Sequence, residues 1–296
     1  MGIVGKLPSL GWDRVDIDAS KPQQTSPHSD VGRLRDLYLE LLIGALTHTV
    51  YSQLDKMEGP EEYREQLCPD IEESEEGWVI FHPELARAQG RDWPLHAQTM
   101  VGLQRLRNVR MCVERVLSDD VPGHMIEAGT WRGGVGILMR GVLKAYGVED
   151  RYVWLADSFQ GLPPADPDRY PADRGSDIHE IESLTVSVDE VRENFRRYGL
   201  LDGQVRFVEG WFRDTLPALR QGVPWSIVRI DADMYGSTME ALVNLYDGLS
   251  PGGFLIVDDF AHEPCRRAVE DFRRDRAVED PIERIDWTGV FWRKDG

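Results

Sequence analysis

The chain has 296 residues, 41% of them apolar, which is enough for one large α/β domain with extra elements or for two small domains. Its 52 Asp and Glu against 34 Lys and Arg give a net charge of −18, which opposes contact with a phosphate backbone and argues against a nucleic-acid partner. No stretch reaches the roughly 18 consecutive apolar residues of a membrane span, so no membrane partner is expected.

The first 30 residues are rich in Gly, Pro, Ser and Asp without periodicity, and predict a flexible N-terminal arm over 1–30. They lack the basic region and hydrophobic run of a secretory signal. Cys68, Cys112 and Cys265 lie far apart with no CxxC spacing, which argues against a disulfide framework or a zinc site. These features predict a cytoplasmic protein.

Residues 31–120 are expected to form a helical extension and a lid. Apolar residues at helical spacing predict helices over 34–51 and 95–117. Between them, the acidic stretch 56–78 is interrupted by prolines and glycines, which favours a loop or lid over a core element.

Residues 121–296 predict a single catalytic domain. Short apolar runs alternate with amphipathic helical segments, a pattern typical of βαβ units in a doubly wound, mostly parallel sheet of an α/β protein. Strands are predicted over 124–130, 152–157, 205–210, 226–231 and 253–259, and helices over 133–146, 188–198, 237–249 and 265–275. A C-terminal antiparallel hairpin, 282–287 with 290–293, brings the expected sheet to seven strands.

Four of the predicted strands carry acidic residues at their carboxyl ends. They are Glu127, Asp157, the pair Asp231 and Asp233, and the pair Asp258 and Asp259. In an open parallel sheet, ligands bind beyond the carboxyl ends of the strands near the topological switch point, so a binding site is expected there.

The loop after the first strand has glycines at 129, 133, 134 and 136, which permit a close approach of backbone to ligand. Its spacing is not G-x-G-x-x-G, and Glu127 would repel the pyrophosphate of NAD. The same carboxylate suits a cationic ligand such as the amino end of S-adenosylmethionine. A tight strand-to-helix turn without a ligand is the alternative interpretation.

Two further features favour a nucleoside. Asp157, at the end of the second strand, has the usual place of a residue that binds the ribose hydroxyls, although an N-cap or Asx turn is also consistent with it. Trp211 and Phe212, followed by Asp214, come after the third strand, where an adenine ring would stack; core packing explains the two aromatics equally well.

The aspartates Asp231, Asp233, Asp258 and Asp259 predict a divalent-cation site. Asp231 and Asp233 are two residues apart and face one side of an extended strand end, beside the next pair. Such a cluster repels itself unless a cation with oxygen ligands, such as Mg²⁺, neutralises it. A cation lowers the pKa of an alcohol while a carboxylate accepts its proton. The alternatives are helix capping, or ion pairs with Arg229 and Arg266.

Histidines are weaker candidates. His124, His179 and His262 could act as bases, but a surface or loop role is favoured for them. No nucleophile elbow, P-loop lysine or Cys/His pair is present, which argues against hydrolases and NTPases.

Several ordered blocks within residues 90–275 closely resemble the macrocin O-methyltransferase family. The blocks are DWP at 92–94, TM at 99–100, EAGTWRGG at 127–134, ADSFQGLP at 156–163, VRENF at 191–195, GWF at 210–212, RIDADMY at 229–235 and SPGGFLIVDD at 250–259. The resemblance implies a Rossmann-like class I methyltransferase fold, S-adenosylmethionine and Mg²⁺ or another divalent cation as cofactors, and a homodimer or higher homo-oligomer. The acceptor it implies is a sugar hydroxyl on a glycosylated natural product.

The resemblance also implies roles for particular residues. The metal ligands would be Asp231, Asp258 and Asp259, with Asp233 as the catalytic base. Cofactor contacts would be made by Thr99, Met100, Glu127, Gly129, Thr130, Asp157, Ser158, Gly161, Ser187 and Asp214. Ala232 stands where the family usually has glycine, and the 90 N-terminal residues match poorly, which leaves the acceptor open.

The sequence therefore predicts a metal-dependent O-methyltransferase for a sugar hydroxyl in antibiotic biosynthesis. A catechol or other small phenol is the alternative acceptor, since the same metal arrangement would serve it. A non-catalytic sensor of S-adenosylmethionine would use Asp157 but has no need of four strand-end aspartates.

Overall fold

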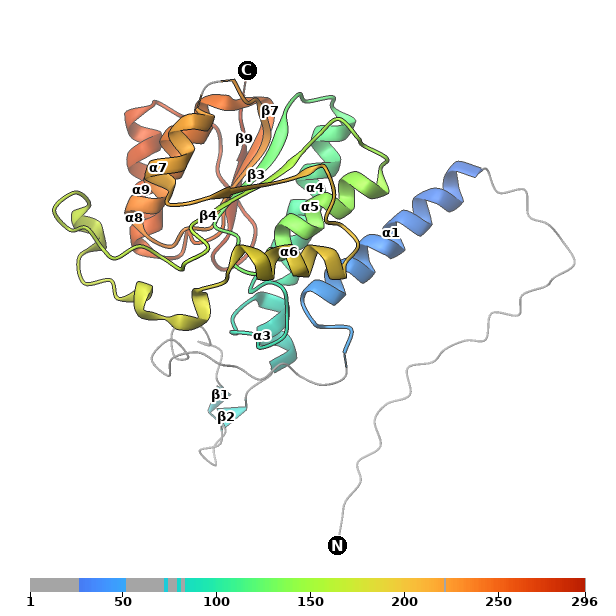
Figure 1. The fold of residues 1–296 in the computed structure, drawn as a ribbon, viewed down its shortest axis with the longest axis horizontal. Coiled ribbons are helices and arrows are strands. Elements are labelled where there is room, and N and C mark those ends of the chain that lie inside the picture. Colours follow the sequence, from blue (N-terminus) through green and yellow to red (C-terminus); the bar gives the residue numbers. More distant parts are fainter. Residues whose placement is uncertain (1–26, 52–71, 74–78, 81–82, 221, 296) are drawn as a thin grey trace, which may run out of the picture.

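The computed structural model describes residues 27–51, 72–73, 79–80, 83–220 and 222–295. Its centre is a seven-stranded sheet of order β5-β4-β3-β6-β7-β9-β8 (Figure 1). The strands are β3 (His124–Ala128), β4 (Val153–Asp157), β5 (Val205–Glu209), β6 (Trp225–Ile230), β7 (Leu249–Val257), β8 (Glu283–Arg284) and β9 (Val290–Arg293). The first five run parallel, while β9 is antiparallel to β7 and to β8, so the predicted fold is confirmed.

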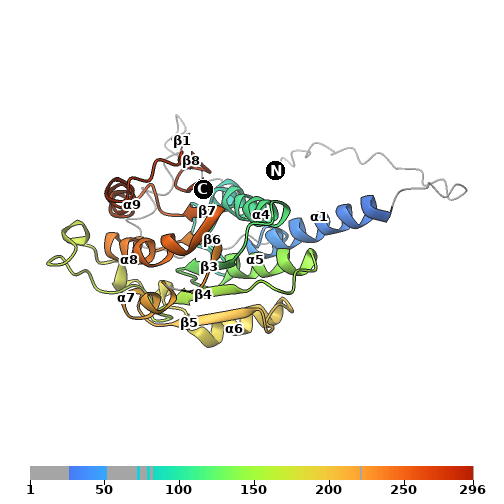
Figure 2. The same ribbon diagram turned by 90° about the horizontal axis from the view of Figure 1, so that it is seen from above.

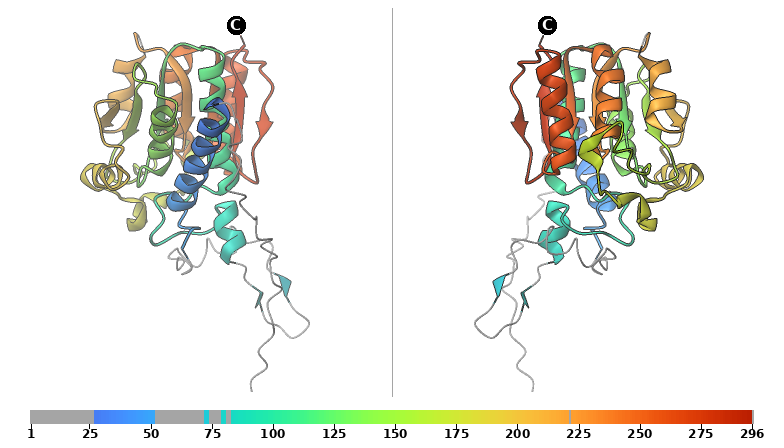
Figure 3. Two further views of the ribbon diagram at one scale, coloured as in Figure 1. Left: turned by 90° about the vertical axis from the view of Figure 1, so that its right-hand side faces the viewer. Right: turned by 90° about the vertical axis from the view of Figure 1, so that its left-hand side faces the viewer.

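Helices cover both faces of the sheet, as Figure 2 shows. One face carries α4 (Leu103–Ser118), α5 (Gly134–Ala145) and α6 (Val188–Arg197), with α1 (Pro27–Leu46) packed outside α4 and α5. The other face carries α7 (Phe212–Thr215), α8 (Tyr235–Leu245) and α9 (Glu263–Asp275). The two views of Figure 3 look at these opposite sides.

Shorter elements complete the described chain. They are α3 (Pro83–Gln89), the antiparallel two-residue strands β1 (Glu72–Glu73) and β2 (Val79–Ile80), and the 3₁₀ turns η1 (Pro171–Asp173), η2 (Ile178–Glu180), η3 (Glu182–Leu184), η4 (Leu216–Leu219) and η5 (Tyr246–Gly248). The strand pair was not predicted. The turns η1 to η3 lie in the long polar connection from β4 to α6.

The central strands explain where a ligand can bind. All six residues of β6 are buried, as expected for a parallel strand covered on both faces. Successive crossovers lead from β3 to β4 and β5 on one side, and to β6 and β7 on the other. The topological switch point therefore lies between β3 and β6, and ligands are expected beyond their carboxyl ends.

Several predicted helix boundaries were wrong, and the helix predicted over 237–249 spans Tyr235–Leu245. The helix predicted over 95–117 begins at Leu103, because Gly102 is extended and lies so close to α3 that a Cβ on it would be 2.4 Å from a backbone carbon of Gln89. The helix predicted over 34–51 spans Pro27–Leu46 and ends before His48, whose φ of 62° is left-handed.

The predicted domain division stays a prediction. The arm over 1–30 lies outside the described residues except for 27–30, which begin α1, and most of the loop over 56–78 is also outside them. Helices α4 and α5 share one buried core across the boundary placed at residue 120. No helix within the described residues is long and apolar enough to cross a membrane.

Candidate active site

Two cavities, of about 1100 Å³ and 870 Å³, open beyond the carboxyl ends of β3, β4 and β6. They share a wall formed by Met100, Thr130, Trp131, Leu184, Asp231 and Asp233. The larger is called the first cavity and the smaller the second. Because Asp231 and Asp233 face both, molecules in the two cavities would meet at these carboxylates.

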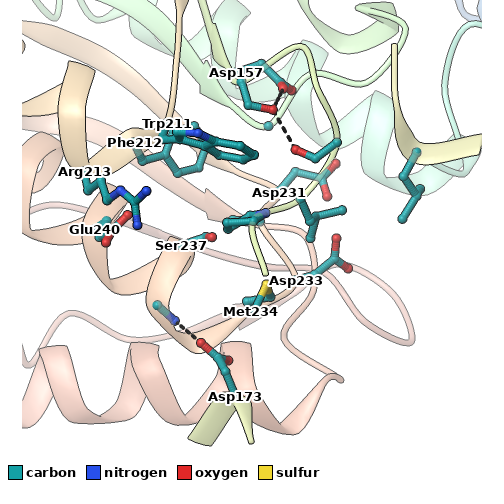
Figure 4. A pocket seen from close by; sticks show the side chains of 18 of the residues that line it. Asp157, Asp173, Trp211, Phe212, Arg213, Asp231, Asp233, Met234, Ser237 and Glu240 are labelled. Atoms are coloured by element: carbon teal, nitrogen blue, oxygen red, sulfur yellow. Dashed lines mark hydrogen bonds between the residues drawn. The ribbon is translucent and has the colours of Figure 1, made fainter. Parts of the chain in front are cut away.

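The first cavity contains the predicted ribose-binding residue. Oδ2 of Asp157 accepts hydrogen bonds from the backbone N–H of Thr130 at 2.7 Å and from its hydroxyl at 3.3 Å (Figure 4). Oδ1 accepts from the backbone N–H of Phe159 at 2.8 Å, which is the Asx turn considered as the alternative. Burial raises the pKa of Asp157, and these donors oppose that rise. The carboxylate is thus oriented by its own chain while still lining the cavity.

Aromatic side chains form another wall of the first cavity. Trp211 and Phe212 lie side by side and project into it, close to the Asp157 side (Figure 4). Ser158 and Gly161 line the same space. The first cavity therefore has both an aromatic platform and an acidic hydrogen-bond acceptor in its lining.

Two predicted cofactor contacts lie outside both cavities. Ser187 caps α6, accepting a hydrogen bond from the N–H of Glu190 at 3.2 Å. Asp214 lies in α7, and its side chain is 63% exposed. Its Oδ2 lies 3.7 Å from Nε of Arg213. A ligand-binding role for Ser187 and Asp214 stays a prediction.

The glycine loop is shaped mainly by packing. Gly129 has φ 90°, and a Cβ on it would lie 1.7 Å from the carbonyl oxygen of Asp231. Gly133 is left-handed at the N-cap of α5, and a Cβ on Gly134 would lie 2.4 Å from the carbonyl oxygen of Gln98. The loop is therefore a tight strand-to-helix turn, and because Gly129 also lines the first cavity, its contact with a ligand stays a prediction.

The second cavity joins the remaining predicted cofactor contacts to the carboxylate cluster. Thr99 and Glu127 line it beside Asp258 and Asp259, whereas Met100 and Thr130 belong to the wall between the cavities. Its lining also contains residues that the sequence analysis did not assign to the site: Asp92, Trp93, Arg105, Trp287 and Thr288.

Three carboxylates approach one another at the ends of β6 and β7. Asp231, Asp258 and Asp259 each offer an oxygen, and these oxygens lie within 4.8 Å of one another. Asp258 and Asp259 are buried, whereas the side chain of Asp231 is 31% exposed toward the cavities. Clustered carboxylate oxygens are the donor set that Mg²⁺ or Ca²⁺ takes in proteins.

A buried arginine in β6 partly neutralises this cluster. Arg229 donates to Oε1 of Glu127 at 2.7 Å, to Oδ2 of Asp231 at 2.9 Å and to Oδ1 of Asp258. The ion pairing with Arg229 that the sequence left as an alternative is therefore present. The other suggested partner, Arg266, instead lies 4.0 Å from Glu270.

The carboxyl groups of the cluster differ in how well their ionised forms are stabilised. Burial would raise the pKa of Asp258, but Arg105 and Arg229 hold it below its usual range. The pKa values of Asp231 and Asp259 are raised, first by burial and then by the neighbouring carboxylates. Arg105 and Arg229 thus stabilise the ionised form of Asp258. The ionised forms of Asp231 and Asp259 would be stabilised by a further positive charge.

These raised pKa values make the effect of Mg²⁺ on stability depend on pH. A carboxyl group whose pKa is raised in the folded protein still holds its proton at pH values at which the unfolded chain has released it. The free energy of unfolding of the metal-free protein therefore decreases as pH rises above about 4, the usual pKa of an aspartate in an unfolded chain. Added Mg²⁺ should therefore raise the melting temperature more at pH 8 than at pH 6, by about 2 °C or more. Differential scanning calorimetry with Mg²⁺ against equal ionic strength of NaCl measures this, and equal shifts at both pH values would contradict it.

Asp233 lies between the two cavities on a tight turn. Its φ of 53° is left-handed, which aspartate tolerates better than most residues. Burial, followed by the charges of Asp231 and Asp258, raises the pKa of Asp233 to about 7. A carboxylate with a pKa near neutrality is suited to accept a proton at physiological pH.

His262, the candidate histidine nearest to the aspartates in sequence, lies beside this centre. It lines the second cavity, and its Nδ1 lies 3.9 Å from Oδ1 of Asp233. Burial lowers the pKa of His262, which favours its neutral form. By contrast, His124 packs edge-on against Tyr152 and, like His179, lines neither cavity.

Ala232 is accommodated without strain between Asp231 and Asp233. It is buried and is not among the described residues with positive φ, so its backbone does not require glycine. Oδ2 of Asp259 accepts hydrogen bonds from the N–H groups of Ala232 and Asp233, at 3.0 and 3.1 Å. Asp259 therefore fixes the turn that carries the other carboxylates.

The long connection from β4 to α6 is fastened over the site by Asp173, which sequence reasoning missed. Its two carboxylate oxygens accept from the N–H groups of Tyr235 and Gly236, at 2.7 and 2.8 Å, and so cap the N-terminus of α8 (Figure 4). In the same connection, the hydroxyl of Tyr170 donates a hydrogen bond to Oε1 of Glu240 in α8 at 3.2 Å. No local sequence signal marks Asp173, because its partner residues are far along the chain.

The strand order, the parallel core with its antiparallel C-terminal edge, and a site at the switch point define a class I methyltransferase fold. The model of the macrocin-O-methyltransferase (TylF) family matches residues 35–294, and the chain belongs to that family. It is therefore a methyltransferase enzyme.

Characterised relatives are similar over nearly their whole length. The 8-demethyl-8-(2,3-dimethoxy-alpha-L-rhamnosyl)-tetracenomycin-C 4'-O-methyltransferase of Streptomyces olivaceus is 48% identical, over 88% of this chain and 93% of its own. The mycinamicin III 3''-O-methyltransferase of Micromonospora griseorubida is 43% identical, over 88% and 96%. The solved structure of the O-methyltransferase NovP has 42% identity and a TM-score of 0.76, covering 88% of this chain and all of that chain.

Proposed function

We propose that this enzyme transfers a methyl group from S-adenosylmethionine to a sugar hydroxyl of a glycosylated natural product, with the help of Mg²⁺ or another divalent cation. The observation that carries the proposal is the pair of cavities that meet at Asp231 and Asp233. One cavity is suited to a nucleoside, and the other lies beside the carboxylates that would activate a hydroxyl. The two are thus positioned for transfer between a donor and an acceptor.

The donor side fits S-adenosylmethionine, which would supply the methyl group. Asp157 would accept hydrogen bonds from the ribose hydroxyls, and Trp211 would stack on the adenine. Oε2 of Glu127 is buried and has no hydrogen bond of good geometry among the described residues, although the backbone N–H of Gly136 acts on this carboxylate. Burial raises the pKa of Glu127 to about 8, so a cationic partner would favour its ionised form. S-adenosylmethionine would extend from the first cavity past Met100 and Thr130 into the second, where that carboxylate is suited to the amino group of the methionine part.

Donor binding can be tested independently of turnover. Asp157→Asn removes the charged acceptor and should weaken S-adenosylmethionine binding by about 10- to 100-fold, the usual value of hydrogen bonds to a charged group. Isothermal titration calorimetry measures this, with Glu209→Gln as control, since Glu209 ends the neighbouring strand but lines neither cavity. Binding of NAD in place of S-adenosylmethionine by the wild-type enzyme would contradict the proposal.

The described residues also fit a divalent cation. Arg229 occupies Oδ2 of Asp231, and two backbone amides occupy Oδ2 of Asp259. Among the described residues these bonds leave Oδ1 of each carboxylate for another ligand, next to Asp258. A bound cation would supply the positive charge that lowers the pKa of an acceptor hydroxyl. Asp231, Asp258 and Asp259 would hold it.

The chain's own groups would perform the rest of the chemistry. Asp233 would accept the proton of the acceptor hydroxyl, with His262 beside it in the second cavity. The connection fastened by Asp173 would limit the access of water to the donor. We take a sugar as the acceptor because the name of one curated relative prints a rhamnosyl group and a 4'-O-methyltransferase, and that of another prints a 3''-O-methyltransferase. Methylation of a catechol or other small phenol instead would contradict this choice.

We further propose a homo-oligomer formed through α1, in the cytoplasm. The outer face of α1 exposes an apolar stripe that includes Leu34, Leu37 and Leu41, each more than 60% exposed. Exposed apolar stripes of this kind mark protein interfaces. Leu37→Asp should shift the molar mass toward the monomer in size-exclusion chromatography with light scattering, whereas an equal change at Ile282, outside the stripe, should not. A wild-type monomer would contradict this proposal.

A further inference from the structure

The turn between β8 and β9 reaches back over the carboxylate cluster, although it is far from it in sequence. Oδ1 of Asp286 accepts hydrogen bonds from the N–H groups of Thr288 and Gly289, at 3.0 and 2.8 Å, which makes the turn compact. The hydroxyl of Thr288 donates to the backbone oxygen of Asp258 at 2.9 Å. The C-terminal turn is therefore bonded to the end of β7.

Arg105 of α4 links this turn to the side chain of Asp258. Its Nε donates to Oδ2 of Asp286 at 2.9 Å, its Nη1 donates to Oδ2 of Asp258, and its Nη2 donates to the carbonyl oxygen of Gly90 at 3.2 Å. The side chains of Arg105 and Asp286 are 6% and 5% exposed. All three guanidinium nitrogens are thus engaged, and they fix the plane of the group.

We propose that Arg105 and Asp286 are positioning residues that set the orientation of Asp258 for binding the divalent cation. This inference rests on the metal site of the proposed function. Arg229 holds Oδ1 of Asp258 and Arg105 holds Oδ2, so the carboxylate is fixed from both sides. The C-terminal turn becomes part of the metal site without contributing a ligand.

Geometry and charge make opposite demands on Arg105. A positive charge beside a ligand carboxylate repels a cation, so charge alone would favour removing this arginine. Its planar fork, however, can bond Asp286 and Asp258 at the same time, which the single ammonium of lysine cannot do with the same geometry. Groups that orient metal ligands in this way typically contribute 10- to 100-fold to metal affinity.

The test uses variants that separate orientation from charge. Arg105→Lys keeps the charge and loses the fork, and Asp286→Asn loses the charged acceptor of Nε while keeping its shape. Arg140 and Asp202 form another pair, at 2.6 Å, in which the arginine is 5% exposed; neither residue lines a cavity. Arg140→Lys and Asp202→Asn are therefore matched controls for the general cost of weakening a buried arginine pair.

The probe is Mn²⁺, whose free concentration is measured by electron paramagnetic resonance without any turnover, with calorimetry to follow folding. Both site variants should bind Mn²⁺ about 10-fold or more weakly than the wild type, while both controls keep the wild-type dissociation constant. Site variants that bind Mn²⁺ within about twofold of the wild type would overturn the inference. Absence of Mn²⁺ binding by the wild type would overturn the proposed metal site itself, so the two failures are distinguishable.

Discussion

Asp233→Asn is expected to lower kcat by about 10²- to 10⁴-fold, the usual contribution of a positioned general base. The amide keeps the size of the side chain but cannot accept the proton of the acceptor hydroxyl. The dissociation constant of S-adenosylmethionine should stay within about twofold of the wild-type value. The proposed ribose and adenine contacts, Asp157 and Trp211, lie in the first cavity away from the wall that contains Asp233. Steady-state kinetics together with calorimetric titration separate these two effects.

The pH profile of the wild-type enzyme provides a second readout for Asp233. Only the ionised carboxylate accepts a proton, so kcat should decrease as pH falls through its pKa. That pKa is about 7 without a cation, and a neighbouring cation lowers it, which places the acidic limb below pH 7. The Asp233→Asn variant should lack this limb. The control is Asp168→Asn, which should behave as the wild type because Asp168 is exposed and lines neither cavity. An unchanged kcat in Asp233→Asn would contradict the role of Asp233 as the base.

Removal of divalent cations with EDTA should lower turnover by about 10²- to 10³-fold, since charge stabilisation by a metal is worth several kcal/mol. Excess Mg²⁺ should restore it. EDTA already saturated with Mg²⁺ is the control for effects of the chelator itself. Full activity of the chelated enzyme would mean that Arg105 and Arg229 alone balance the cluster, and the metal would have no place in the mechanism.

The fold could be predicted because its signals are local and periodic. Apolar runs of strand length, separated by amphipathic segments, predict a parallel sheet, and the C-terminal ends of such strands must share one edge. This rule brought Asp157, Asp231 and Asp258 to one place without any knowledge of their side-chain contacts. The helix starting at Leu103 was misplaced because apolar spacing continues through the irregular segment before Gly102.

The arginines of the site show how far ion pairs can be predicted from the sequence. Arg229 lies near the end of β6, two residues before Asp231, and the sequence left their ion pair open as an alternative. Arg105 lies on the buried stripe of α4 with Val109, Cys112 and Val116. A charged residue on an apolar stripe signals a buried partner, but only the tertiary structure shows that Asp258 and Asp286 are those partners.

The glycines of the loop after β3 have a structural cause that the sequence alone did not show. Gly129 is required by the carbonyl oxygen of Asp231, in addition to any approach of a ligand in the first cavity. The loop also contributes to the site, because this contact places the end of β3 next to the end of β6, where Asp231 lies. Thr130 then bonds Asp157 and connects the first cavity to the second.

The central claim is tested most directly by following a ¹³C-labelled methyl group from S-adenosylmethionine. The enzyme is incubated with Mg²⁺ and an equal mixture of a natural-product glycoside with free sugar hydroxyls and a simple catechol, and the products are examined by NMR. The account predicts a labelled O-methyl group on a sugar carbon, which is lost with EDTA and in Asp233→Asn. Label on the catechol with none on the glycoside, or label on the sugar that persists in both controls, would contradict it.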